Sequence, residues 1–207
     1  MARRTKAEAA ETKEALLDAA EQVFLEVGVT RASLEQISRC AGLTRGALYW
    51  HFRNKEDLFR AMINRVSIPF QELISGLDDP TLADRPLDAI RLACHAGARH
   101  LDTPRHRRVH GILLHHCERT SSFDPMSIKD EFVCETHHTL LQHFREAHNK
   151  GQLREDLTPE LATDIFHYSL SGMFWEWLRA PEAFSLSQQG PVLIDKLIDM
   201  MRRSSPQ

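Results

Sequence analysis

Side chains that could bind a polyanion are concentrated in one short segment of the chain, residues 44–55. A guanidinium group can donate two parallel hydrogen bonds to a guanine edge. Hydroxyl, phenol, indole and imidazole groups can reach phosphates or thymine methyl groups, and a glycine lets a helix backbone approach a partner closely. The segment supplies these groups as Thr44, Arg45, Gly46, Tyr49, Trp50 and His51. We therefore expect this segment to contact double-stranded DNA.

Two further residues stand where helices are expected to begin. Ser33 precedes one apolar helical pattern, and Lys55 follows the capping residue Asn54 of another. The first N–H groups of a helix point outward and favour an anion at that position. Ser33 and Lys55 are therefore predicted to contact backbone phosphates.

The distribution of charge agrees with a nucleic-acid partner, although the net charge of the chain is −3. Residues 1–66 contain 11 Lys and Arg against 9 Asp and Glu, whereas the remainder contains 15 against 20. No acidic residue lies between Glu35 and Glu56, but several basic residues do. They are Arg39, Arg45, Arg53 and Lys55. A phosphate backbone would tolerate this surface.

Short helices are expected to position these side chains. The apolar stripe over residues 16–27 predicts a first helix. A capping-box signature at Ser33 begins a second helix of about two turns, and Gly42 ends it. Thr44 can cap a third helix. Two helices joined by such a tight turn form a helix-turn-helix, here over residues 33–52.

The rest of the chain shows the same helical period and no alternating strand pattern, so we predict an all-α fold. Asn54 caps a fourth helix that runs to about Pro69. Five further helices are predicted over residues 86–101, 104–119, 125–150, 159–179 and 190–203. This gives about nine helices, with a first domain that ends near residue 70.

A purely structural interpretation of the 44–55 segment remains open from the residue types alone. In that interpretation Tyr49 and Trp50 are core aromatics and Arg45 is a solvated surface residue. For a generic helical segment, this structural interpretation is favoured over contact with DNA.

The full string from Ser33 to Lys55, SLEQISRCAGLTRGALYWHFRNK, resembles the DNA-binding signature of the TetR family of repressors. The N-terminal string MARRTKAEAAETKEALLDAAEQVFLEVGV, together with TRGALYWHF and NKEDLF, is similar to the AcrR-like branch of that family, which represses multidrug efflux pumps. LLHHCE at Leu113–Glu118 and FWEWLRAPEAFSL at Phe174–Leu186 resemble the C-terminal half of that branch more weakly.

The resemblance implies a domain organisation. Residues 10–70 would form the helix-turn-helix DNA-binding domain, and residues 71–207 would form a ligand-binding and dimerisation domain. The last two helices would pair with those of a second copy to form a homodimer. The helices over residues 159–179 and 190–203 carry more apolar surface than one face can bury, which permits this arrangement. Two-fold symmetry would then predict a palindromic operator.

The resemblance also implies a small lipophilic effector inside the C-terminal helices. The candidate contacts are Phe70, His110, Leu114, Phe132, Phe144, Phe166, Met173 and Trp175. The residue types alone favour a core position over a ligand contact for each of them. Some relatives place a ligand-binding acid on the fourth helix, but this chain has Ile63 and Ser67 there.

Other classes of protein find less support. No GxSxG, HExxH or phosphate-binding glycine loop is present, so we predict neither an enzyme nor a cofactor. The 12 histidines make no complete metal site by spacing, and the four cysteines are scattered, which favours reduced thiols. No stretch approaches the roughly 20 apolar residues of a membrane span, and no signal peptide is present, so we expect a cytoplasmic protein.

We therefore expect a repressor of a multidrug efflux operon that a lipophilic effector releases from DNA. Two alternatives stay open. One is a TetR-type regulator of a metabolic or lipid gene, and the other is a metal- or ligand-sensing helical protein whose DNA motif is vestigial.

Overall fold

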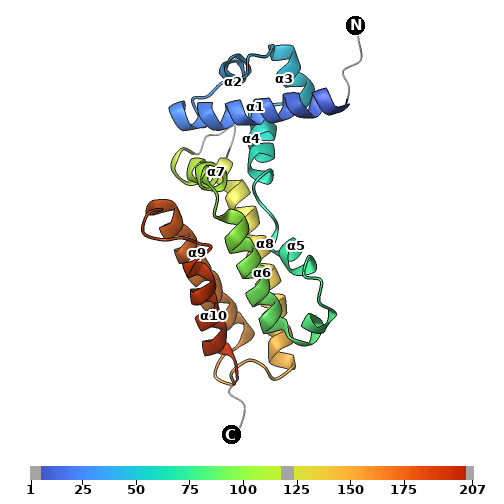
Figure 1. Cartoon of the computed structure of the whole chain (residues 1–207), viewed down its shortest axis with the longest axis vertical. Coiled ribbons are helices and arrows are strands. Elements are labelled where there is room, and N and C mark those ends of the chain that lie inside the picture. The colour runs from blue at the N-terminus through green and yellow to red at the C-terminus, as the bar shows by residue number, and fades with distance from the viewer. Residues whose placement is uncertain (1–5, 118–123, 204–207) are drawn as a thin grey trace. The chain divides into compact units, whose positions relative to one another are not determined.

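The computed structural model describes residues 6–117 and 124–203, and within them the chain forms ten α-helices and one short 3₁₀-helix (Figure 1). The prediction of an all-α fold is confirmed. The helices are α1 (Lys6–Val27), α2 (Leu34–Cys40), α3 (Arg45–His51), α4 (Lys55–Asn64), α5 (Phe70–Ser75), η1 (Pro80–Asp84), α6 (Pro86–Leu101), α7 (Pro104–His115), α8 (Pro125–Asn149), α9 (Pro159–Arg179) and α10 (Gln189–Met201).

The fourth helix is shorter than predicted. It ends at Asn64 instead of running to about Pro69, and Pro69 precedes a separate helix, α5, that the sequence analysis did not identify. The ring of Pro69 disfavours helical backbone at the residue before it, which separates the two helices. The predicted bounds of α6 and α9 agree with the structure. Helix α7 ends at His115 and is shorter than the predicted helix over residues 104–119, of which residues 118 and 119 lie outside the described residues.

The chain divides into two compact units. The first comprises the described parts of residues 1–67 and 105–130, and the second comprises those of residues 68–104 and 131–207. The chain first passes from one unit to the other after Ser67, and the predicted domain boundary lies near residue 70. Residues 105–115 of α7 belong to the first unit, which the chain therefore enters twice.

The first unit packs α1 against α2, α3 and α4. The apolar stripe of α1, including Leu16 and Phe24, is fully buried, and so are Leu48 of α3 and Phe59 of α4. The Phe24 and Phe59 rings meet edge to face with centroids 5.7 Å apart. Gly42 has φ +66°, a left-handed conformation that suits glycine, and it turns the chain from α2 to α3.

The second unit has an apolar core to which five helices contribute side chains. Phe70 of α5, Ile90 of α6, Phe144 of α8, Phe166 of α9 and Ile198 of α10 are buried in one cluster. A further group of contacts centres on Asp102, at the end of α6. Its carboxylate accepts hydrogen bonds from the Trp177 indole and from the Ser185 and Ser187 hydroxyls. The core and the Asp102 group together join α6, α9 and the segment before α10.

Candidate nucleic-acid interface

Helix α3 presents its large polar and aromatic side chains outward. Trp50 is 72% exposed and Tyr49 is 49% exposed, whereas Leu48 is fully buried. The Arg45 side chain is also exposed. Tyr49 and Trp50 are therefore not core aromatics, and the structural interpretation of these two residues is wrong. His51 is half-buried, and its ring lies edge to face against Trp50 with centroids 4.5 Å apart.

Hydroxyl groups cap both helices of the predicted helix-turn-helix. The Ser33 Oγ accepts from the Gln36 N–H at 3.1 Å, and the Ser33 N–H donates to the Gln36 side chain at 2.8 Å, which completes the predicted capping box. The Thr44 Oγ1 accepts from the Ala47 N–H at 3.2 Å. Each hydroxyl still carries a proton, which it can donate to a phosphate oxygen. The cap predicted at Asn54 also forms, onto the Asp57 N–H.

The fold of this chain does not itself require the glycine at position 46. Gly46 lies in α3, and its φ lies outside the left-handed region. A Cβ added there would approach only the Thr44 Oγ1, at an ordinary contact distance of 3.9 Å. A need for glycine at this exposed position would therefore arise from a partner that approaches the helix.

One carboxylate lies beside the basic side chains of this surface. The Glu35 carboxylate is 3.4 Å from the Arg39 guanidinium and 3.8 Å from that of Arg45. All three side chains are more than half exposed, so the pairs are weak and screened by salt. A phosphate or a base edge can compete for Arg45 at small cost.

Lys55 has a different role from the one predicted. Its ammonium group donates to the carbonyl oxygens of Val29, Thr30 and Ala32 at 2.8, 2.8 and 3.0 Å. Burial lowers the pKa of Lys55. These three bonds use all three N–H donors of the group, so it holds the loop before α2 instead of presenting a donor to phosphate. The partners lie 23 to 26 residues away in sequence, and no local pattern could have indicated them.

The residue that follows α7 also binds this loop. The Val29 N–H donates to the His116 carbonyl oxygen at 3.0 Å. The loop that leads into α2 is therefore fixed both to the first residue of α4 and to the residue that follows α7.

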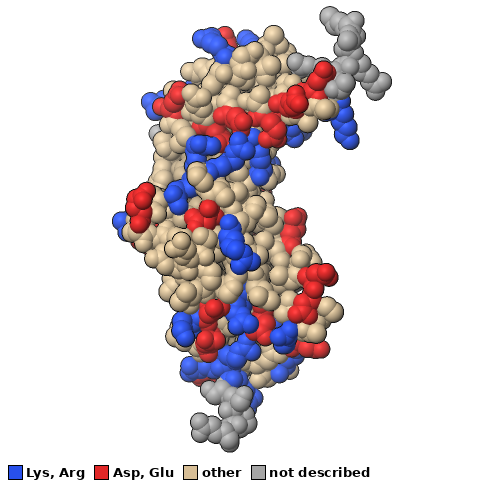
Figure 2. Space-filling model, viewed as in Figure 1, with Lys and Arg blue, Asp and Glu red and all other residues tan. Residues whose placement is uncertain are grey.

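A cluster of buried and half-buried charges joins α1, α4 and α7, and we call it the Glu21 cluster. The Glu21 side chain is only 3% exposed and pairs with Arg65, which follows α4, and with Arg105 and Arg108 of α7. Figure 2 shows acidic atoms along α1 with basic atoms adjoining them. Asp18 and Glu14 of α1 also pair with Arg65, at 3.0 and 2.8 Å. Burial alone would lower the pKa of Arg65, but its bonds to these acids outweigh burial and raise it.

The residues predicted to bind an effector lie in different surroundings in the structure. Phe70, Phe144 and Phe166 are buried in the core of the second unit, and Met173 packs against that core. Trp175 is 47% exposed. Phe132 is half-buried on α8. Their role as ligand contacts stays a prediction.

The two remaining effector candidates lie on α7 in the first unit, His110 and Leu114, and both are half-buried. The His110 Nδ1 donates to the His106 carbonyl oxygen at 2.8 Å. Within the described residues no group of three or more metal-ligating side chains occurs. No described helix is long and apolar enough to cross a membrane. All four cysteines are free thiols.

Helices α9 and α10 carry large apolar side chains that this chain leaves exposed. On α9 they follow the helical spacing and are Leu161, Ile165, Tyr168 and Trp175. On α10 they are Val192, Leu193 and Met200. The two helices contact each other, so these side chains belong to neighbouring elements. We call the set the α9–α10 apolar surface.

Family models match both parts of the chain. The model described as bacterial regulatory proteins, tetR family, matches residues 16–62, and that described as MAATS-type transcriptional repressor, C-terminal region, matches residues 86–203. The HTH-type transcriptional repressor BepR of Brucella suis biovar 1 (strain 1330) is 34% identical over 205 residues, which cover 97% of this chain and 96% of BepR. The HTH-type transcriptional regulator AcrR of Shigella flexneri is 30% identical, with 97% and 94% covered.

Solved structures give the same result. The crystal structure of NalD, the secondary repressor of the MexAB-OprM multidrug efflux pump in Pseudomonas aeruginosa, matches with a TM-score of 0.81 at 33% identity over 97% of this chain and 100% of NalD. The SmeT–triclosan complex matches with a TM-score of 0.80 at 30% identity over 94% of this chain and 93% of SmeT. With its exposed α3 and two matching family models, the chain belongs to the TetR family of bacterial transcriptional regulators.

Proposed function

We propose that this protein is a ligand-responsive repressor of a multidrug efflux operon, acting on DNA in the cytoplasm. The observation that carries the DNA-binding part is the exposure of Tyr49 and Trp50 beside Arg45 on α3. The efflux target rests on relatives of high coverage, because NalD is itself a repressor of an efflux pump.

The side chains of this surface divide into two roles. Arg45 would read a guanine edge, and Tyr49, Trp50 and His51 of the same helix would contact phosphates or thymine methyl groups. The Ser33 and Thr44 hydroxyls are placed to donate to backbone phosphates at the starts of α2 and α3. Lys55 acts behind this surface, because its ammonium holds the loop before α2.

Two copies of the chain would bind one operator. The α9–α10 apolar surface would be covered by the same surface of a second copy, which removes its large side chains from water. Two-fold symmetry then places two α3 helices in major grooves about 34–36 Å apart, or a multiple of one DNA turn, on a palindromic site.

An effector can release the protein from DNA through α4, because one end of that helix is bound to the loop before α2 and the other end to α1. Lys55 begins α4 and holds the loop before α2, while Arg65 follows its last residue and pairs with Glu21 of α1. A shift of α4 therefore also displaces α1 and α2. A ligand that prefers the DNA-incompetent form a hundredfold supplies about 2.7 kcal/mol of coupling, enough to lower occupancy strongly.

The experiment that tests this proposal measures binding of the purified protein to the DNA upstream of its own gene by fluorescence anisotropy, at fixed salt and with competitor DNA. Triclosan and a panel of lipophilic compounds are then added, since SmeT binds triclosan. We expect tight binding that at least one compound abolishes. Binding no tighter than to random DNA would overturn the proposal, and release by fatty acids alone would favour a lipid-gene regulator.

Two variants sharpen the assignment of α3. Arg45→Ala should weaken operator binding by about 1–3 kcal/mol and random DNA much less, if Arg45 reads a base. Gly46→Ala should leave the fold intact, because its Cβ would meet only the Thr44 Oγ1 at an ordinary contact distance, yet weaken DNA binding if the helix backbone lies close to DNA. Arg145→Ala, which removes an exposed arginine of α8 in the second unit, is the matched control and should change neither affinity. Equal losses on both DNAs for Arg45→Ala would contradict base reading.

A further inference from the structure

The helix-turn-helix over residues 33–52 contains a single acidic residue, Glu35. It lies in the first turn of α2, and its side chain is 55% exposed beside that of Arg45. A carboxylate on a DNA-binding surface repels phosphates, which lowers the affinity for every sequence. Phosphate binding alone therefore does not explain the presence of an acid at this position.

The two oxygens of the Glu35 carboxylate are shared between two arginines. Oε1 lies 3.4 Å from the guanidinium of Arg39, one turn further along α2. Oε2 lies 3.8 Å from Nη1 of Arg45, the first residue of α3. One exposed ion pair is weak, but a network of three charges orders its members more than an isolated pair does.

Buried contacts and backbone hydrogen bonds fix α2 against α3. Ile37 of α2 and Leu48 of α3 are both fully buried. In the turn between the helices, the Leu43 N–H donates to the Ser38 carbonyl oxygen at 2.8 Å. The backbone at both ends of the ion pair is therefore held by packing, and only the side chains need to be ordered.

The ion pair leaves part of the Arg45 guanidinium available. A guanidinium has five N–H donors, and the O6 and N7 atoms of guanine need two neighbouring ones. With Nη1 beside Glu35, the edge formed by Nε and Nη2 remains. Among the described residues Arg45 has no further hydrogen bond or ion pair. Arg45 can therefore contact Glu35 and a guanine at the same time.

We propose that Glu35 is a positioning residue for base recognition, which orients the Arg45 side chain so that Nε and Nη2 meet a guanine. On a sequence without that guanine, Arg45 gains no base contact and the carboxylate only repels phosphates. Glu35 thus raises sequence specificity while it lowers overall affinity. The inference rests on the proposed function, because it assigns a role in DNA recognition.

The test selects bound sequences from a randomised duplex library with the full-length protein and compares the base preferences of variants by sequencing. Arg45→Ala should abolish the preference at one position of each half-site. Glu35→Gln should lower the preference at that same position about threefold and leave the others unchanged, because it removes an exposed ion pair but no base contact. A folding defect would weaken binding to all sequences alike, whereas Glu35→Gln should bind random DNA at least as tightly as the unchanged protein.

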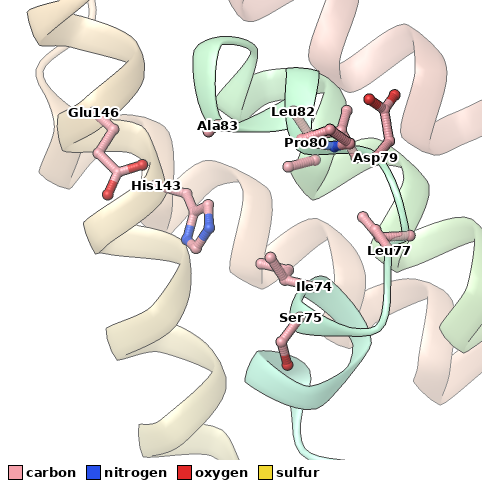
Figure 3. Close-up of a pocket in the computed structure, with 10 residues that line it drawn as sticks. Ile74, Ser75, Leu77, Asp79, Pro80, Leu82, Ala83, His143 and Glu146 are labelled. Carbon is pink, nitrogen blue, oxygen red and sulfur yellow. The ribbon is translucent and has the colours of Figure 1, made fainter.

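Two other glutamates provide controls with the same change of charge. Glu56 is exposed and is the second residue of α4, as Glu35 is of α2. Glu146 is exposed on α8, in the second unit (Figure 3). Glu56→Gln and Glu146→Gln should leave every base preference unchanged.

The double variant of Glu35→Gln with Arg45→Ala should lose no preference beyond that lost in Arg45→Ala alone, because Glu35 acts through Arg45. An unchanged preference in Glu35→Gln, at the position where Arg45→Ala abolishes it, would overturn the inference and leave the proposed function standing. The inference also fails if Arg45→Ala keeps every preference. A library from which the unchanged protein enriches no sequence would overturn both.

Discussion

Both units enclose an apolar core, but the first unit adds a buried carboxylate that is held by arginines. Glu21, with its side chain 3% exposed, pairs with Arg65, which follows α4, and with Arg105 and Arg108 of α7. In the second unit the edge-to-face rings of Phe144 and Phe166, with centroids 5.8 Å apart, lie in the apolar core. Ion pairs depend on charge state and geometry, while a hydrocarbon core depends on volume. The two units should therefore respond to different kinds of substitution.

The largest effect should come from removing volume in the second unit. Phe166→Ala should lower the free energy of unfolding by about 3–5 kcal/mol, because the ring is fully buried. Hydrogen exchange of peptides from α9 and α1 measures this loss separately in the two units. Val133→Ala, at a half-exposed position on α8, is the control. A small loss would instead indicate that Phe166 lines a space open to ligand.

Removal of the buried charge of Glu21 in the first unit should have the next largest effect. Glu21→Gln leaves Arg65, whose side chain is 12% exposed, without its buried partner. The expected loss is about 3 kcal/mol, and it should appear as faster exchange in α1 and α4. Asp18→Asn, at an exposed position on the same helix, should cost much less. Comparable losses for both variants would mean that the burial of Glu21 does not increase the contribution of its ion pairs to stability.

A substitution of Lys55 tests whether its ammonium supports the loop before α2 or contacts a DNA phosphate. Lys55→Met keeps the length of the side chain but removes its three donors to the loop before α2, which should cost about 2 kcal/mol of stability in the first unit. The salt dependence of operator binding should keep its slope. A slope lowered by about one unit with unchanged stability would restore the originally predicted phosphate contact.

The smallest effect concerns pH and the second unit. Burial would raise the pKa of Asp102, but hydrogen bonds from Ser187, Ser185 and Trp177 outweigh it and lower the pKa to about 2. The unfolded value is higher, so the stabilisation by Asp102 is present above about pH 4 and is lost as the pH falls toward 2. Because Asp102 is partly exposed, we expect about 1 kcal/mol. Urea unfolding of Asp102→Asn should differ from the unchanged protein at pH 6, and the difference should shrink as the pH falls toward 2.

Local signals in the sequence predicted the DNA-binding elements well. The caps at Ser33, Thr44 and Asn54 each involve a partner three residues away, and the turn at Gly42 needs only its own backbone conformation. Such features are visible in a short window of sequence. They correctly predicted the helix-turn-helix and the outward face of α3.

Long-range partners account for what the sequence could not show. Lys55 was expected on phosphate because it begins a helix, but its carbonyl partners come from a distant loop. Phe144 and Phe166 satisfied the pattern for either a core or a ligand pocket, and only packing distinguishes the two. Helix α5 was not predicted because it has only six residues, which are too few to show a helical period. It lies between Pro69 and the 3₁₀-helix that begins at Pro80.

The return of the chain through residues 105–130 has a practical consequence for engineering hybrid regulators. A graft that exchanges only the first 67 residues would separate Glu21 from Arg105 and Arg108, and Val29 from the His116 carbonyl. Specificity could be transplanted between relatives more safely by moving α7 along with the N-terminal helices, or by replacing only exposed residues of α3. Non-functional chimeras joined near residue 67 should recover when the donor's α7 is included.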